Sequence, residues 1–122
     1  MSELRADTIT ASDGTSPVTL TKQSAAKAWV NFNGTGTIAA RDSLNLSSLT
    51  DNSTGNYTSS WSSALANASY SALYGAGVNG VITAQERLQT ILTGSYRIEM
   101  NEDGSAAADS SYVMLGIHGD LA

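Results

Sequence analysis

The run Ala28-Trp29-Val30-Asn31-Phe32-Asn33 decides the fold class of this chain. Its first, third and fifth residues are apolar, and its fourth and sixth are polar. Because successive side chains of a β-strand point to opposite faces of a sheet, this alternation predicts a strand with one face toward a core. The chain is therefore expected to build its core from sheets.

Strand patterns recur along the rest of the chain. They cover Leu44–Thr50, where a slip of phase suits a bulge, and also Tyr57–Trp61, Tyr70–Tyr74 and Tyr96–Met100. The run Tyr112–His118 is apolar on both faces, so we expect it at the centre of a sheet or beneath an interface. Polar turn signals separate these runs at 12–14, 33–34, 51–55, 75–80, 93–94 and 101–104. Such spacing predicts a mostly β fold, a single antiparallel β-sandwich or jelly-roll-like domain.

Two segments fit more than one structure. Residues 84–92 combine good helix formers with apolar Leu88, Ile91 and Leu92 at helical spacing. The same segment also fits a strand that ends near Leu92, before the stop signal at 93–94. Lys22–Lys27 fits a single helical turn. The sequence leaves the choice between helix and strand open for residues 84–92.

The N-terminal residues form a separate unit in this interpretation, an arm over residues 1–26 that precedes a β-sandwich domain over residues 27–122. Apolar segments at residues 4–10 and 18–21 flank Asp13-Gly14, a strong two-residue hairpin signal. A lone two-stranded hairpin is marginal in water, so the arm needs a partner surface. The alternative is a disordered or folded-back terminus. The side chains expected to anchor the arm on that surface are Leu4, Ile9, Val18 and Leu20.

The composition excludes several classes of protein. A hydrophobic content of 41% over 122 residues suffices for one compact core, and the absence of cysteine excludes disulfides and thiolate metal sites. A net charge of −5 with six basic residues argues against nucleic acid as a partner. No run is apolar enough to span a membrane, and the N-terminus lacks the apolar stretch of a signal peptide. We therefore expect a soluble protein made in a cytoplasm, without membrane partners.

Residues that could carry chemistry are few. His118 is the single histidine, and nothing resembling a nucleophile elbow accompanies it and its neighbour Asp120. Asp51–Asn56 has alternating oxygen-bearing side chains but lacks the bidentate Glu of an EF-hand, which favours a polar turn over a calcium site. We expect no enzyme, no cofactor and no bound metal.

Acidic and aromatic residues each allow more than one interpretation. A solvated loop is expected for the acidic group, with a catalytic carboxylate pair or a weak cation site as alternatives. This group consists of Glu99, Glu102, Asp103 and Asp109. The period-two spacing of the aromatic residues fits core or subunit-interface packing better than a stacking platform for sugars. These residues are Trp29, Tyr57, Trp61, Tyr70 and Tyr74.

Several stretches in the first half of the chain resemble sequences that recur in marine phage tail-fibre and other virion surface proteins. They are Ser2–Ile9, Leu20–Ile38, Arg41–Asn45 and Asp51–Thr58. Composition alone does not explain their combination. From about Val78 onward the sequence departs from the pattern.

This resemblance implies a β-structured homotrimer on a virion, made in the cytoplasm of a bacterial host, and it implies no catalytic residues. A tail fibre generally needs a shaft or receptor-binding head, whereas a capsid decoration (cement) protein needs an anchor and a compact acidic outer domain. We therefore expect trimers that bind the major capsid protein on the outer surface of the capsid and stabilise the shell. The alternative is a short tail-fibre or adhesion protein that binds tail proteins and a host receptor. The possible trimer interface comprises Trp29, Val30, Phe32, Trp61, Tyr112 and Met114.

Overall fold

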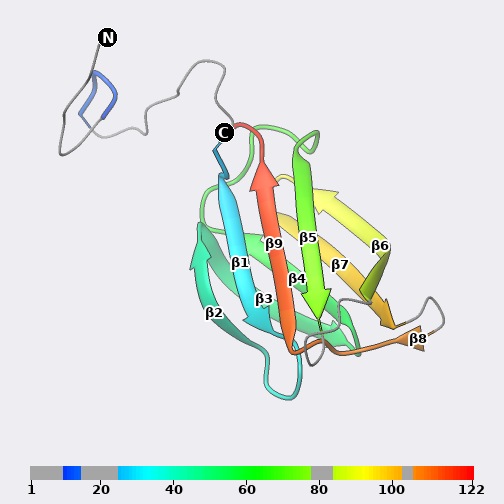
Figure 1. The fold of residues 1–122 in the computed structure, drawn as a ribbon. Coiled ribbons are helices and arrows are strands. Elements are labelled where there is room, and N and C mark those ends of the chain that lie inside the picture. The colour runs from blue at the N-terminus through cyan, green and yellow to red at the C-terminus, as the bar shows by residue number, and fades with distance from the viewer. Residues whose placement is uncertain (1–9, 15–24, 78–83, 103–105) are drawn as a thin grey trace, which may run out of the picture.

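The computed structural model describes residues 10–14, 25–77, 84–102 and 106–122. Within these ranges the chain forms nine strands and no helix (Figure 1). The strands are β1 (Ala28–Asn33), β2 (Ala39–Leu44), β3 (Leu46–Ser53), β4 (Asn56–Trp61), β5 (Ser71–Gly77), β6 (Ala84–Leu92), β7 (Ser95–Glu102), β8 (Ala106–Ala107) and β9 (Tyr112–His118). The segment 84–92 is thus a strand and not a helix.

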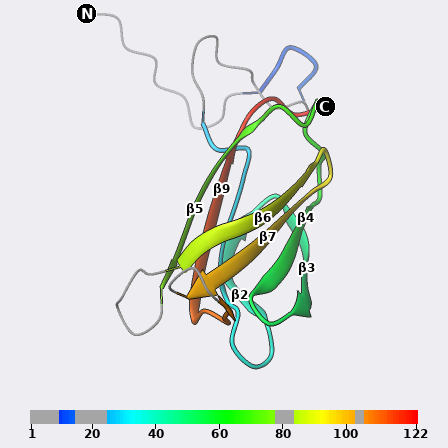
Figure 2. The ribbon, with the colours of Figure 1, turned by 90° about the vertical axis from the view of Figure 1, so that its right-hand side faces the viewer.

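The strands form two antiparallel sheets that pack face to face. The first sheet has the order β2-β1-β9-β5, and the second has the order β3-β4-β7-β6 with β8 paired to β7. Figure 1 shows the first sheet in front of the second, and Figure 2 shows the same two layers from the side. The expected mostly β class with antiparallel sheets is confirmed.

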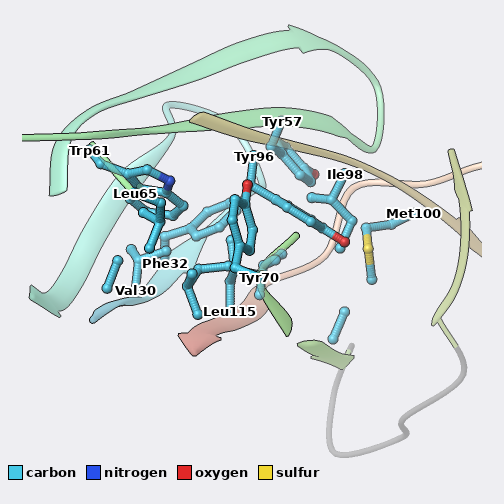
Figure 3. Packing of buried hydrophobic residues seen from close by; sticks show 14 residues of the cluster. Val30, Phe32, Tyr57, Trp61, Leu65, Tyr70, Tyr96, Ile98, Met100 and Leu115 are labelled. Atoms are coloured by element: carbon cyan, nitrogen blue, oxygen red, sulfur yellow. The ribbon is translucent and has the colours of Figure 1, made fainter. Parts of the chain in front are cut away.

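A single core lies between the two sheets, as the alternation of apolar residues predicts (Figure 3). Phe32 of β1 packs against Tyr57 of β4, and the two rings meet edge to face with centroids 5.3 Å apart. Tyr70, just before β5, packs against Tyr96 of β7 with ring centroids 6.4 Å apart. Aromatic pairs of this kind stabilise a core beyond the area that they bury.

The central position expected for Tyr112–His118 is confirmed. Strand β9 lies between β1 and β5, with Leu115 opposite Val30 on one side and opposite Tyr74 on the other. Val113, Leu115 and Ile117 are buried, so the odd-numbered residues of β9 face the core. The intervening residues, Tyr112, Met114 and Gly116, therefore face away from it.

The strand and bulge predicted within Leu44–Thr50 are present, because β3 covers Leu46–Ser53 and its register against β4 shifts between Leu46 and Ser48. Leu44, however, does not belong to this strand. The chain changes sheets inside that segment, because β2 ends at Leu44 and β3 begins at Leu46. Asn45 makes the turn with a φ of 58°, a left-handed conformation that asparagine tolerates better than most residues. Its side-chain amide donates to the carbonyl oxygens of Lys27 and Ser63, and its side-chain oxygen accepts from the Ser63 N–H.

Only a small part of the arm lies within the described residues. The Gly14 N–H donates to the Ala11 carbonyl oxygen at 2.9 Å, and Gly14 has a φ of 76°. The turn is therefore centred on Ser12-Asp13 rather than on Asp13-Gly14, with Gly14 as its last residue. No helical turn forms over the described residues 25–27.

The proposed anchoring residues cannot be placed in the structure. Leu4, Ile9, Val18 and Leu20 lie outside the described residues, as do residues 22–24 of the expected helical turn.

Two loop glycines allow the cost of backbone strain to be separated from the cost of crowding. Gly36 and Gly55 both have positive φ, but a Cβ at Gly36 would have open space, whereas one at Gly55 would lie 2.6 Å from the Met100 carbonyl oxygen. We expect Gly36→Ala to lower the free energy of unfolding by about 1 to 2 kcal/mol through backbone strain alone. Gly55→Ala should lower it by about 1 to 3 kcal/mol more, through overpacking.

Urea denaturation of the two alanine variants measures this difference, with Gly36→Ala as the matched control for strain. Equal destabilisation of the two variants would contradict the crowding seen at Gly55.

Candidate interaction surfaces

The outer face of the first sheet exposes several large apolar side chains, beside the polar Asn31 and Asp42 in the next row of the sheet. We call it the apolar face and define it by Trp29, Leu44, Leu73, Tyr112 and Met114. Seven large hydrophobic side chains are exposed among the described residues, and four of them belong to this face. Because soluble monomers rarely expose large contiguous apolar patches, such a face indicates a site of association.

Register explains how residues distant in sequence form this face. Trp29 lies opposite Leu44 in β2 and opposite Gly116 in β9, and Gly116 lies opposite Leu73 in β5. Residues directly opposite each other in a sheet share a face. The result is one row, Leu44-Trp29-Gly116-Leu73, that crosses all four strands, with Leu73 the most exposed of its hydrophobic side chains at 64%.

A second part of the apolar face lies beside this row. Met114 pairs with Asn31 and with Gly75. The guanidinium of Arg41 lies over the Tyr112 ring, 4.2 Å from its centroid, and donates to the Ser111 carbonyl oxygen at 2.7 Å. This contact holds the Tyr112 ring at the margin of the face.

The six residues expected at a trimer interface separate into two groups. Val30, Phe32 and Trp61 are 1%, 0% and 6% exposed, so their side chains belong to the core of one chain and present no surface to another. Trp29, Tyr112 and Met114 lie on the apolar face. Sequence reasoning missed Leu44, Leu73 and Gly116 there. For Leu73, the alternation with Ala72 and Tyr74 could have indicated that its side chain lies on the opposite face of the strand from theirs.

The outer face of the second sheet carries a group of polar side chains that hydrogen bonds connect. Asn56, on β4, is buried, and its side-chain oxygen accepts from Arg97 Nε at 2.8 Å and from Asn52 Nδ2 at 3.2 Å. Its amide donates to Glu99 Oε2, and the Asn52 amide also donates to Thr58 Oγ1. We call these five residues the polar face. The two outer faces of the sandwich thus differ in chemistry.

A buried tyrosine joins three loops at one end of the sandwich. The Tyr57 hydroxyl lies 3.0 Å from Asp109 Oδ1 and 3.2 Å from the Gly34 carbonyl oxygen, and it accepts from the Ser110 N–H. Asp109 Oδ1 also accepts from the Gly55 N–H at 2.7 Å. Burial, followed by the hydrogen bond to Asp109, raises the pKa of Tyr57 well above its usual range.

The acidic group expected in one loop is divided between two places. Glu99 belongs to the polar face, and Asp109 belongs to the Tyr57 hydrogen-bond network. The side chains of Glu102 and Asp103 lie outside the described part of the chain. Glu99 and Asp109 therefore hold other protein groups in place.

The remaining residues considered for chemistry are also dispersed. His118 lies on β9 opposite Ser71, and the Asn52 and Asn56 amides of the candidate calcium turn donate to protein oxygens. No group of three or more His, Asp or Glu side chains that could hold a metal occurs in the described ranges. In those ranges, no helix is long and apolar enough to cross a membrane.

Comparison of the chain with protein-family models, curated proteins and solved structures gives no match.

The Tyr57 hydroxyl should contribute measurably to stability. Tyr57→Phe leaves Gly34, Asp109 and Ser110 without this hydrogen-bond partner, at an expected cost of about 1 to 3 kcal/mol in the free energy of unfolding. Tyr112→Phe is the control, since that ring is exposed and keeps its contact with Arg41.

Alkaline pH gives a second measurement on the same variant. The pKa of Tyr57 is raised in the folded protein, so above pH 10 the unfolded chain loses its phenolic proton first and stability falls. We expect a shallower fall in Tyr57→Phe. The stability of this variant should still fall to some extent with rising pH, because burial also raises the pKa of Tyr70. Equal slopes in wild type and Tyr57→Phe would contradict this assignment.

Proposed function

We propose that the chain is a non-enzymatic structural protein of a bacteriophage particle, a capsid decoration protein that forms homotrimers on the shell and stabilises it. The observation that carries this proposal is the two-sided sandwich, with an apolar face on one sheet and a polar face on the other. The resemblance of its first half to phage virion surface proteins supplies the biological setting.

The two faces match what a shell-bound protein requires. A protein fixed in an assembly needs one surface that gains free energy by leaving water and another that stays solvated. The row Leu44-Trp29-Gly116-Leu73 fits the first requirement. The polar face, with Arg97 and Glu99 tied to Asn56, fits the second.

The arm supplies the contact with the major capsid protein in this proposal. The described chain resumes at Ala25, and the Lys27 N–H donates to the Ile117 carbonyl oxygen at 2.8 Å, beside the apolar face. An arm that begins there can pass from the sandwich to the shell. Several such arms held by one oligomer multiply modest contacts into firm binding.

A tail-fibre or adhesion protein is the second candidate, and the polar face favours it. Asn52 and Arg97 are held in place by their hydrogen bonds to the buried Asn56, so they present amide and guanidinium groups at a low entropic cost. Such a surface suits a polar ligand on a host cell.

The copy number in purified virions distinguishes the two roles. Quantitative mass spectrometry against the major capsid protein should find on the order of hundreds of copies per particle if many weak contacts cover the shell. A handful of copies would place the protein on the tail and contradict the capsid role.

The arm can be tested without changing the length of the chain. The double variant Val18→Ser, Leu20→Ser should remain folded but bind less to particles that lack the protein, because it loses apolar contacts. Thr19→Ser is the control in the same segment. Undiminished binding of the double variant would show that the anchor lies elsewhere.

A further inference from the structure

We infer that the apolar face binds the apolar face of a second copy of this chain, and that the open position above Gly116 receives a side chain of that copy. This goes beyond the proposed function, because a face that binds the same face of a second copy closes a two-fold pair. The contact therefore joins two copies that belong to neighbouring trimers and does not build the trimer itself. The inference concerns self-association alone and does not depend on a virion.

Gly116 leaves a gap in the row of large side chains. It lies in the central strand β9, between Trp29 in β1 and Leu73 in β5. A Cβ built there would have the Leu73 carbonyl oxygen, 4.0 Å away, as its nearest neighbour. Gly116 is itself half-buried, but the space directly above its Cα is free of close neighbours in the single chain.

Packing within the chain explains Gly34 and Gly55 but not Gly116. A Cβ at Gly34 would lie 2.5 Å from the Tyr57 hydroxyl oxygen, and one at Gly55 would meet backbone atoms. Gly116 has neither such crowding nor a positive φ. Glycine inside a strand weakens the strand, and it often marks a place where another chain or a ligand approaches closely.

Shape favours a second sheet as the occupant. Two sheets that pack face to face lie about 10 Å apart with interdigitated side chains, which requires projections and gaps on both surfaces. The row provides both, since Trp29 and Leu73 project on either side of Gly116. The same face of a second copy supplies matching projections and gaps.

Charge points to the same occupant. The whole chain has a net charge of −5, so two copies repel each other in general. The strands of the first sheet contain one acidic and one basic residue, Asp42 and Arg41, which cancel. Strands β3, β4, β6 and β7 contain four acidic and two basic residues. Contact through the first sheet therefore brings two copies together at their least charged surface.

The size of the face sets the expected strength. Four strands about 4.8 Å apart, each rising about 3.3 Å per residue over some six or seven residues, cover roughly 400 Å² of sheet. A standard interface buries about 800 Å² per partner, so this contact alone is small. We expect association that depends on concentration in the micromolar range rather than a permanent oligomer.

Sedimentation velocity of the full chain over about 1 to 200 µM tests the inference. Leu73→Ser and Gly116→Val should each weaken association by about tenfold or more, the first by removing apolar contact and the second by filling the gap. Leu92→Ser is the matched control, because Leu92 is 54% exposed on the second sheet. It should associate as the wild type does. Gly116→Val should also melt no lower than wild type, since valine suits a strand and its Cβ would meet no neighbour closer than 4.0 Å.

Three results would overturn the inference. The first is a wild-type chain that stays monomeric at every concentration, and the second is a Leu92→Ser variant whose association is weakened as much as that of the face variants. The third is loss of association on deletion of residues 1–21 while Leu73→Ser and Gly116→Val associate as the wild type does. The last result would assign the contact to the arm. A dimer that depends on Leu73 and Gly116 would support this interface while contradicting the trimer of the proposed function. Conversely, a low copy number in virions would overturn the capsid role and leave the self-association measurement unaffected.

Discussion

The pairing of β9 with β1 and β5 is the constraint on which the rest of the structure depends. Because side chains alternate along a strand, this pairing sends Val113, Leu115 and Ile117 into the core and Tyr112 and Met114 to the outside. A central strand with one buried face needs apolar residues on that face only. Strand β9 is apolar on both, so the same register that builds the core also builds an exposed apolar surface.

Strands whose inward positions are apolar could be predicted from sequence, because their signal is local. Ala28–Asn33 was predicted with its observed ends, and the burial of Tyr57 and Tyr96 follows the expected alternation. Strand β2 was missed because it is a mostly exposed edge strand with little alternation to recognise. Residues 84–92 remained ambiguous because their strand is defined by pairing with β7, a contact that local propensity does not encode.

The apolar face could be predicted only in part, for a related reason. The sequence identified Trp29, Tyr112 and Met114 as candidates, yet it grouped them with Val30, Phe32 and Trp61, whose side chains are buried. Separating the two groups requires the order of strands in each sheet. Leu73 and Gly116 join Trp29 in one row solely because β5 and β1 both pair with β9, and these strands are distant in sequence.

A weak self-contact has physical advantages for a protein that works in a particle. At low concentration the net charge of −5 keeps free copies apart, and an interface of limited area does not overcome this. In the proposed role, arms would hold neighbouring copies on one surface, so that association becomes effectively intramolecular at local concentrations of about a millimolar. The same small apolar face then suffices to join neighbours. A stronger interface would form oligomers before they reached the shell, so the modest size of the face fits a component that completes its assembly on the particle.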